Sequence, residues 1–170
     1  ANVEQLILTG LAVSGTGNVL DNTLIGNTAD NVLDGGAGND SLSGGLGNDT
    51  LIGGDGDDIL DGGDGLDTVS YASRTATVSI DMAAGTVTGA AGNDTLISIE
   101  RVLGGSGNDW LAGTTGGAGV TLAGGTGDDI YVISNAADVI SEAASGGNDT
   151  VYAGIDYTLA ANVESLVLTG

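Results

Sequence analysis

The sequence has no cysteine, proline, histidine, phenylalanine or lysine, and aromatic residues make up only 3% of its 170 positions. Without histidine or cysteine, the usual nucleophile–base arrangements of enzymes cannot be built. Without cysteine, no disulfide stabilises the fold, which fits an exported protein that does not rely on disulfides. The shortage of aromatic residues argues against an ordinary globular core. A narrow core of Leu, Val and Ile is expected instead.

Basic residues are almost as scarce, since two arginines face 23 acidic residues and the formal net charge is −21. Self-repulsion on this scale opposes compaction. An acidic chain without basic patches argues against nucleic acid and anionic membranes as partners. We find no N-terminal signal peptide and no apolar run long enough to insert into a membrane. This agrees with secretion directed by a C-terminal signal, and equally with a piece cut from a longer protein.

Glycine, by contrast, is abundant, with 33 residues, and much of it lies in a tandem repeat over residues 35–70. The four nine-residue repeats there read GGAGNDSLS, GGLGNDTLI, GGDGDDILD and GGDGLDTVS. Glycine at positions one, two and four permits a tight turn with positive φ. The apolar residue at position eight, between mostly small or polar neighbours, predicts a three-residue, half-buried strand after a six-residue turn.

Strands this short must stack on copies of themselves. We therefore expect an all-β fold, a parallel β-roll or β-solenoid with two repeats, about 18 residues, per coil. Asp40 then lies over Asp58, and Asp49 over Asp67. Carboxylates about one strand spacing (~4.8 Å) apart repel each other unless a cation lies between them. Carboxylate and glycine carbonyl oxygens form a flexible hard-cation site that favours Ca²⁺ over Mg²⁺.

The expected Ca²⁺ ligands of this block are its position-six aspartates and the glycines at positions two and four of each repeat. They are Asp40, Asp49, Asp58, Asp67, Gly36, Gly38, Gly45, Gly47, Gly54, Gly56, Gly63 and Gly65. Roughly eight to ten bound Ca²⁺ ions would offset most of the charge of −21 and couple metal binding to folding.

The pattern resembles the RTX (repeats-in-toxin) calcium-binding family. That resemblance implies a parallel β-roll, calcium-dependent folding and export by a type I secretion system. The location it implies is extracellular or at the cell surface.

Imperfect repeats flank this block and extend the set of expected Ca²⁺ ligands. Asparagine replaces aspartate in residues 17–34, which reads either as weak ligands or as a structural asparagine ladder. Downstream, GAAGNDTLI (89–97), GGSGNDWLA (104–112) and GGTGDDIYV (124–132) restore the acid. Three of the downstream aspartates are spaced by 20 residues, which predicts a second calcium column. The added ligands are Asn22, Asn31, Asp94, Asp109, Asp129, Asp149, Gly105, Gly107, Gly125 and Gly127.

We divide the single expected solenoid, residues 1–170, into five segments. They are lead-in coils (1–34), a first calcium column (35–70), wider spacer coils (71–103), a second calcium column (104–152) and the start of a further repeat (153–170). In the spacer, Val78, Ile80 and Met82 alternate with polar residues and predict a longer strand, followed by a turn at Ala84-Gly85. Glu100 and Arg101 are interpreted as surface charges.

The two ends of the chain share a sequence. Residues 1–10 read ANVEQLILTG and residues 161–170 read ANVESLVLTG, an offset of 160 with eight of ten positions identical. Either the chain comes from a longer array, or copies of it stack end to end through these segments, or this is a common coil type. Val3, Leu6 and Leu8 are expected to face the core. Tyr131 is also expected in the core, and Trp110 on the surface.

The first functional hypothesis is a calcium-dependent structural or adhesive repeat of an extracellular or cell-surface protein, such as a fibre, surface layer or adhesin. The alternative is a C-terminal calcium-folding module of a secreted protease, lipase or polysaccharide-modifying enzyme. Ice binding requires a long outward column of Thr and Asn, which is missing. We expect no catalytic residue, no organic cofactor and no enzymatic activity. A polysaccharide or a cell surface is a candidate partner.

Overall fold

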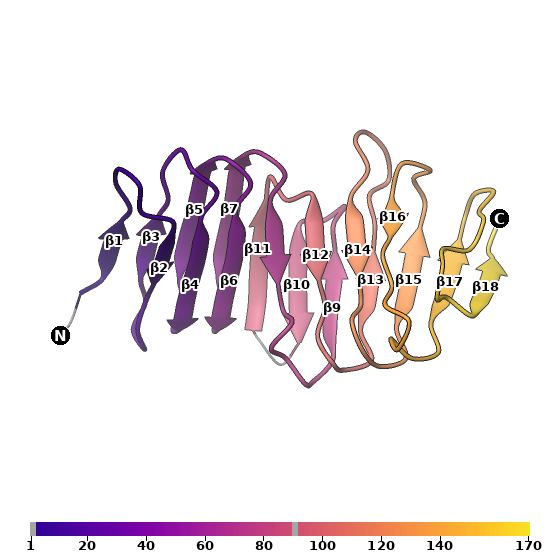
Figure 1. Ribbon diagram of the computed structural model, residues 1–170. Helices are drawn as coiled ribbons and strands as arrows, with labels where there is room; N and C mark the ends of the chain where they lie inside the picture. Colours follow the sequence, from indigo (N-terminus) through magenta and orange to yellow (C-terminus); the bar gives the residue numbers. More distant parts are fainter. Residues whose placement is uncertain (1–2, 90–91) are drawn as a thin grey trace. The chain divides into compact units, whose positions relative to one another are not determined.

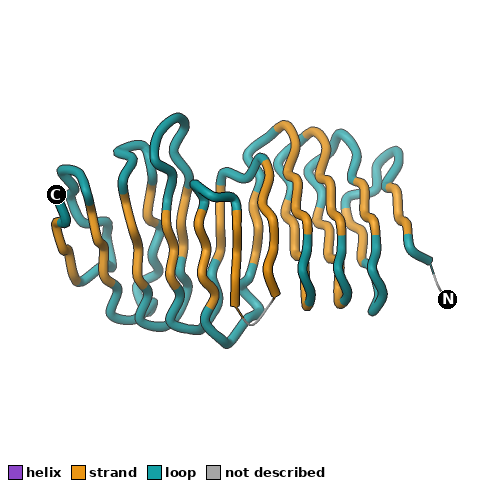
Figure 2. Tube along the Cα trace, turned by 180° about the vertical axis from the view of Figure 1, so that it is seen from behind, coloured by secondary structure: helices purple, strands orange, loops and turns teal. Residues whose placement is uncertain are grey.

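Short β-strands alternate with glycine-rich turns along the whole described chain. The computed structural model describes residues 3–89 and 92–170, and within these ranges every regular element is a strand (Figures 1 and 2). Strands that follow one another in sequence mostly lie in different sheets, and strands two apart pair in parallel. The chain is thus an all-β parallel β-solenoid with about 18 residues per coil, as predicted.

The coils form two groups, and each is described separately. The first coil group is residues 1–70 with 91–100, and the second is residues 71–90 with 101–170. The strands of the first group are β1 (Gln5–Ile7), β2 (Ser14–Thr16), β3 (Thr23–Ile25), β4 (Val32–Ala37), β5 (Ser41–Leu46), β6 (Thr50–Asp55), β7 (Ile59–Asp64), β8 (Thr68–Ser70) and β11 (Gly92–Ile97). Those of the second are β9 (Val78–Asp81), β10 (Thr86–Gly89), β12 (Arg101–Leu103), β13 (Trp110–Ala112), β14 (Thr121–Ala123), β15 (Ile130–Ile133), β16 (Val139–Ile140), β17 (Thr150–Ala153) and β18 (Ser165–Leu168).

In the first coil group, β1, β3, β5, β7 and β11 form one parallel row, and β2, β4, β6 and β8 form the other. The position-eight residues point between the two rows, where Leu24, Leu42 and Leu60 stack in register. Leu33, Leu51 and Val69 form the facing column, and all six side chains are at most 1% exposed. The narrow aliphatic core expected from the composition is therefore present.

Three of the four strands of the perfect repeats are longer than predicted, whereas β8 has the predicted three residues. β5 includes Gly44 and Gly45 of the next repeat, and β4, β6 and β7 likewise run for six residues. Gly36 pairs with Gly54, and Gly45 with Gly63, in the neighbouring coils. The glycines that we assigned wholly to turns also supply backbone pairing, because identical coils stack in register.

The segment expected as a wider spacer is an inserted hairpin followed by a return to the first coil group. β9 and β10 pair antiparallel, joined by a turn at Gly85, where φ is 66°. β11 then pairs with β7, Leu96 opposite Leu60, as the next coil of the first group. Ala90 and Ala91, part of the predicted 89–97 repeat, lie outside the described residues.

In the second coil group, β10, β9, β13, β15, β17 and β18 form one row, and β12, β14 and β16 form the other. Ile80, Leu111 and Tyr131 stack in register and are fully buried. Tyr131 thus lies in the core and Trp110 is half-exposed, close to expectation.

At the first coil, the core expectation was correct for Leu8, which is buried, and wrong for Val3, which is 56% exposed. Leu6 is half-buried. In the described part of the chain we find no helical segment with the length and apolar character needed to cross a bilayer.

Candidate metal site

The position-six residues of the first coil group form ladders in which each side chain bonds the backbone one coil away. The N–H of Asn22 donates to Oδ1 of Asp40 (2.7 Å), and the N–H of Asp40 donates to Oδ1 of Asp58 (2.8 Å). The N–H of Asp58 donates to Oδ1 of Asp94 (3.0 Å). We call this series the first ladder. It has the vertical register that the 18-residue coil predicts.

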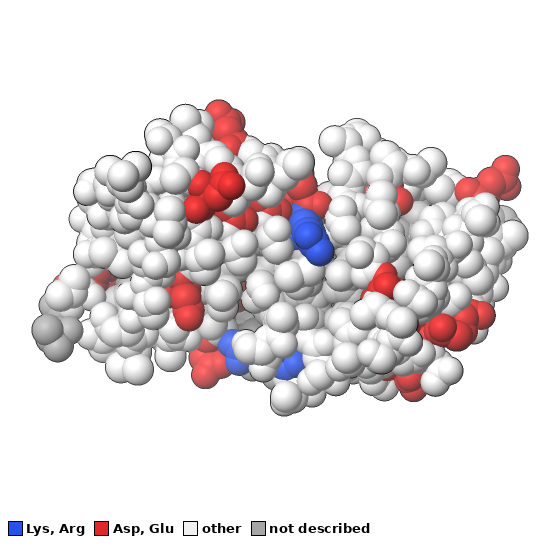
Figure 3. Space-filling model, in the orientation of Figure 1, with Lys and Arg blue, Asp and Glu red and all other residues white. Residues whose placement is uncertain are grey.

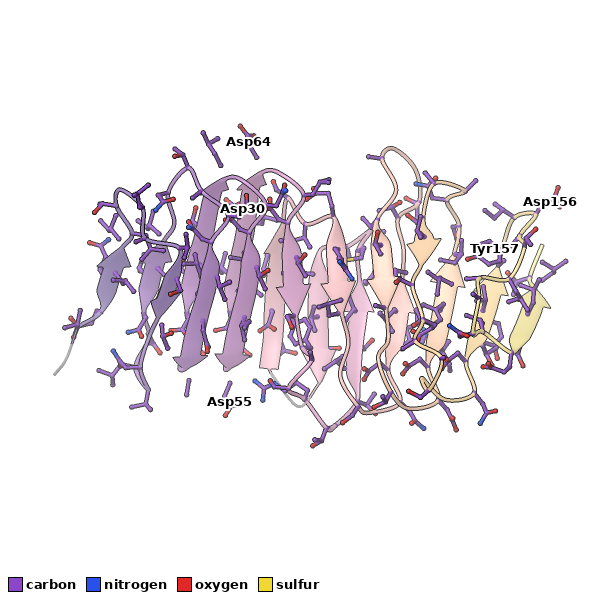
Figure 4. All side chains as sticks on the ribbon, viewed as in Figure 1. Asp30, Asp55, Asp64, Asp156 and Tyr157 are labelled. Atoms are coloured by element: carbon purple, nitrogen blue, oxygen red, sulfur yellow. The ribbon has the colours of Figure 1, made fainter. Side chains whose placement is uncertain are left out.

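A second ladder occupies the other turn of the same coils. It runs from Asn31 to Asp49 (2.7 Å), from Asp49 to Asp67 (2.7 Å) and from Asp67 to Oε2 of Glu100 (2.8 Å). In Figure 4, Asp55, the last residue of β6, lies at one edge of the first coil group, and Asp30 and Asp64 lie at the opposite edge. Acidic residues thus lie at both edges of this group.

The second coil group contains a third ladder, which includes the three aspartates spaced by 20 residues. The N–H of Val78 donates to Oδ1 of Asp109 (2.9 Å), Asp109 donates to Asp129 (2.7 Å), and Asp129 donates to Asp149 (2.9 Å). The N–H of Asp149 in turn donates to Oε2 of Glu164 (2.8 Å). The two-residue insertions in the sequence therefore leave the carboxylates aligned.

The aspartate carboxylates of the ladders are buried, and in most of them one oxygen has no hydrogen-bond partner. The Oδ2 atoms in that condition include those of Asp40, Asp49, Asp67, Asp129 and Asp149, and each of these residues is at most 2% exposed. On the face drawn in Figure 3, much of the surface is correspondingly uncharged, with separate acidic patches. Burying an unpaired carboxylate costs several kcal/mol in effective terms. These oxygens therefore require a proton or a cation.

The first glycine of each repeat, which we did not assign to the site, lies directly against these oxygens. A Cβ built on Gly35 would collide with Oδ2 of Asp40 and with the carbonyl oxygen of Gly53 in the neighbouring coil. A Cβ on Gly44 would meet the equivalent oxygens of Asp49 and Gly62. A carboxylate oxygen and a carbonyl oxygen thus converge at the space that a side chain would fill.

This donor set fits a hard cation. Carboxylate and backbone carbonyl oxygens are the ligands that Ca²⁺ takes in flexible, high-coordination sites. Among residues 3–89 and 92–170, no three acidic side chains converge on one point, so a cation bound here would take part of its coordination from backbone carbonyls. The assignment of individual ligands stays a prediction.

The glycines at positions two and four, which we did assign, have a different role in the backbone. Nine of the twelve have positive φ, between 96° and 136°: Gly36, Gly38, Gly45, Gly47, Gly54, Gly56, Gly63, Gly125 and Gly127. A Cβ on Gly54 would collide with the carbonyl oxygen of Gly36 in the coil below. Gly65, Gly105 and Gly107 lack positive φ, yet added Cβ atoms there would also meet backbone atoms of neighbouring coils.

Burial makes these carboxyl groups hard to ionise when no cation is bound. It raises the pKa of Asp40, Asp49, Asp67, Asp109 and Asp149 above the ordinary value. The pKa of Asp129 rises to about 7, first because of burial and then because of neighbouring acids that include Asp109 and Asp149. A bound divalent cation would reverse this preference and keep the groups ionised.

A second, exposed series of side chains at position five was missed by the sequence reasoning. The N–H of Asn39 donates to Oδ1 of Asp21 (2.8 Å), the N–H of Asp57 to Oδ1 of Asn39 (3.0 Å), and the N–H of Asn93 to Oδ1 of Asp57 (2.8 Å). Charged and neutral residues alternate, which doubles the spacing between like charges. The signal was visible in the sequence, because position five is Asn or Asp in most repeats.

Glu100 does not behave as the surface charge that we expected. It is half-buried, and its Oε2 occupies the ladder position that an aspartate fills elsewhere. Glu164 has the same hydrogen bond in the second coil group.

The turn opposite the third ladder contains no such series. Val120 occupies the ladder position there, and its N–H donates to Oδ1 of Asp138 (3.1 Å). Glu142 accepts hydrogen bonds from the Tyr131 hydroxyl and from the N–H of Gly124. Burial is the main reason that the pKa of Tyr131 is raised.

We compared the chain with models of known protein families, and one family matches. The family model described as the RTX calcium-binding nonapeptide repeat (4 copies) matches residues 16–51, 38–69, 84–98 and 143–157. The chain belongs to this RTX repeat family. The RTX matches contain Asp94 and Asp149, whereas Asp109 and Asp129 lie outside them and are linked to Asp149 by the third ladder.

Two proteins of Rhizobium meliloti (strain 1021) are similar to part of the RTX chain. The endo-1,3-1,4-beta-glycanase ExsH is 43% identical over 65 residues, which is 38% of this chain and 14% of that protein. The endo-1,3-1,4-beta-glycanase EglC is 43% identical over 51 residues, 30% of this chain and 11% of that protein. The similarity therefore spans a small part of each relative.

Proposed function

We propose that this chain is a calcium-dependent structural or adhesive repeat module of an extracellular or cell-surface protein, and that it folds on binding several Ca²⁺ ions after export. The observation that supports this most strongly is the set of buried, unpaired Oδ2 atoms in the ladders. Such atoms oppose folding without a cation and favour it with one.

The residues act together in this proposal. When bound, Ca²⁺ supplies positive charge and open coordination positions. The ladder Oδ1 atoms hold each carboxylate in place against the backbone of the neighbouring coil. The Oδ2 atoms and the nearby glycine carbonyls provide the ligands. At low calcium, the charge of −21 and the high glycine content keep the chain unfolded.

Far-UV circular dichroism tests this coupling. With excess EDTA the β signal should be lost, and with Ca²⁺ near ~1 mM it should return, because extracellular calcium sites have modest affinities. A spectrum that does not change on chelation would contradict the proposal. Mg²⁺ at the same concentration is the control, and it should restore little of the signal because it requires a more rigid octahedral geometry.

The matched ends favour a repeat unit within an array. β1 pairs with β3, which follows it in the chain, and β18 pairs with β17, which precedes it. The shared end sequence forms β1 at one end of the chain and β18 at the other. Among the described strands, the edge strand β1 is paired only on the side of the strand that follows it, and β18 only on the side of the strand that precedes it. Copies of the module would join if β18 of one copy also took the place of β1 in the next. Ala1 and Asn2 of the first segment lie outside the described residues.

Side chains at the first coil indicate how such a junction would be completed. The Nδ2 groups of Asn18 and Asn22 donate to the carbonyl oxygen of Val3 (2.9 and 3.3 Å). Val163 matches Val3 at the offset of 160, so its carbonyl would accept the asparagines of a following copy. A protein with two tandem copies should melt at a higher temperature in Ca²⁺ than one copy, because the junction pairs two edges. Equal melting temperatures would argue against the array.

The relatives support a second candidate function, a calcium-folding module attached to a secreted polysaccharide-degrading enzyme. Both are named as endo-1,3-1,4-beta-glycanases, and the similarity covers at most 14% of their length. The sequence flanking this chain separates the two candidates, since further 160-residue repeats support the array and a catalytic domain supports the attached module. In either case we propose that the chain itself is not an enzyme.

A further inference from the structure

Two ladders end on a glutamate rather than on an aspartate. The N–H of Asp67 donates to Oε2 of Glu100, and the N–H of Asp149 donates to Oε2 of Glu164, both at 2.8 Å. These bonds replace the N–H to Oδ1 bonds that link aspartates elsewhere in the ladders. Two of the four RTX family matches end at residues 98 and 157, shortly before Glu100 and Glu164.

The two glutamates share a local structure as well as a hydrogen bond. Each follows a buried aliphatic residue, Ile99 or Val163, both 8% exposed, and each directly precedes a strand. Two positions before each glutamate the backbone adopts a positive φ at a non-glycine residue, 52° at Ser98 and 64° at Asn162. Non-glycine residues rarely adopt this conformation. The recurrence indicates one motif, built without the glycine turn of the ordinary repeats.

At Asp67 this motif completes a donor set. Oδ2 of Asp67 is buried without a hydrogen-bond partner, and the residue is fully buried. A Cβ on Gly62 would collide with both Asp67 and the carbonyl oxygen of Ser98. In the preceding coil, Gly62 itself provides the corresponding carbonyl beside Asp49. Ser98 therefore takes the place of a glycine carbonyl, and Glu100 takes the place of the next aspartate.

The end of the third ladder has a related arrangement. Oδ2 of Asp149 is likewise buried and unpaired, and Glu164 contacts its backbone N–H. A Cβ on Gly146 would meet Oδ2 of Asp149 and Oε2 of Glu142, so another carboxylate lies nearby. The carboxylates of Asp149 and Glu142 would repel each other at this space unless a cation lay between them.

We propose that Glu100 and Glu164 are terminal Ca²⁺ ligands, which close the acidic ladders with a carboxylate where the glycine-rich repeat stops. The inference rests on the proposed calcium-dependent function and extends it to residues outside the nine-residue pattern. Glu4 occupies the same position in residues 1–10, so in an array it would close the third ladder of the preceding copy.

Charge-removing substitutions distinguish two roles for the glutamates, that of a Ca²⁺ ligand and that of a hydrogen-bond acceptor which only caps the ladder. Glu100→Gln and Glu164→Gln each keep an oxygen that accepts the aspartate N–H, and each removes one negative charge. Isothermal titration calorimetry should show one fewer tight Ca²⁺ ion per variant, or one site weakened roughly tenfold or more. The calcium midpoint of the circular dichroism transition should shift upward. Asp156→Asn is the matched control, because Asp156 is exposed and lies outside the ladders (Figure 4).

Isotherms of both glutamine variants that coincide with those of wild type and of Asp156→Asn would overturn this inference and leave a structural cap. The reference variant Asp49→Asn distinguishes this result from a failure of the proposed function. If the wild-type protein binds Ca²⁺ and Asp49→Asn weakens that binding, unchanged glutamine variants refute only the role of the glutamates. If wild type binds no Ca²⁺, the proposed function itself fails.

Discussion

The backbone N–H of Asp49 donates to Oδ1 of Asp67, 2.7 Å away in the next coil of the first group, while Oδ2 of both side chains is buried without a hydrogen-bond partner. One oxygen of each carboxylate thus stabilises the stacking of the coils, and the other is directed to the candidate cation site. In the proposed function, folding and metal binding therefore depend on the same side chains.

Replacement of a ladder aspartate should weaken Ca²⁺ binding far more than replacement of an acid elsewhere. Asp49→Ala removes both the unpaired oxygen and the bond to the Asn31 N–H, so affinity in titration calorimetry should fall at least roughly tenfold. Asp81→Ala is the control, since Oδ1 of Asp81 accepts only a local bond from Ala84 in the hairpin turn (2.9 Å). Equal losses in the two variants would show that the ladder register does not define the sites.

A methyl group at the first glycine of a repeat should block the site. The Cβ of Gly44→Ala would collide with Oδ2 of Asp49, although the φ of Gly44 lies outside the strained positive region. We expect weaker Ca²⁺ binding, and thermal unfolding in Ca²⁺ should show a loss of about 2 kcal/mol or more. Gly116→Ala is the matched control, because nothing lies within 4 Å of its Cβ. Similar behaviour of both variants would contradict a cation beside Gly44.

In EDTA, the little structure that remains should depend on pH in the direction opposite to ordinary acid denaturation. Burial raises the pKa of Asp129 from 3.8 to about 7, so between these values the metal-free folded state binds more protons than the unfolded chain. Stability without metal should therefore be greatest below about pH 4 and fall as the pH rises towards 7. Calcium affinity should rise across the same window, because protons compete for the carboxylates.

Circular dichroism in EDTA from pH 4 to pH 8 provides the measurement for this prediction. Asp129→Asn is the comparison, and it should reduce the dependence on pH because position 129 no longer titrates. A β signal in EDTA that increases from pH 4 to pH 7 would contradict the expected direction.

The aliphatic core should be as sensitive as that of a globular protein, despite its narrow width. Leu51 is fully buried between Leu33 and Val69, and Leu51→Ala should destabilise the calcium-bound protein by about 2–5 kcal/mol. Leu66 is 69% exposed, and Leu66→Ala should change stability by less than about 0.5 kcal/mol. Urea unfolding at saturating Ca²⁺ measures both. A small effect at Leu51 would mean that the metal sites alone hold the coils together.

Much of the fold followed from local repetition. With two repeats per coil, Asp40 had to stack on Asp58 and Leu42 on Leu60, and both relations are present. Glycines at positions two and four had to permit unusual backbone angles, and nine of those assigned have positive φ. These features depend on contacts between equivalent positions of adjacent coils, so the repeat length predicts them directly.

Other features depended on contacts that no repeat length specifies. The hairpin of β9 and β10 interrupts the sequence, yet Asp94 continues the ladder of Asp58 after 36 residues. The role of the first glycine required the position of the carboxylate of its own repeat and of a carbonyl one coil away. Glu100 lies outside the nine-residue pattern, so we interpreted it as a surface charge. Its contact with the N–H of Asp67 joins residues 33 positions apart, which no repeat spacing predicts.

The sequence alone thus determined the coil length, the core columns, the acidic register and a set of oxygen donors that suits a hard cation, because each arises from one short pattern stacked on itself. The tertiary structure decided which oxygens are buried without partners, where the hairpin of β9 and β10 interrupts the repeats, and that glutamates end two of the ladders. These depend on the convergence of distant segments, Ser98 and Glu100 beside Asp67 above all. Spacing along the chain does not encode that convergence, because it is fixed only when the coils are packed.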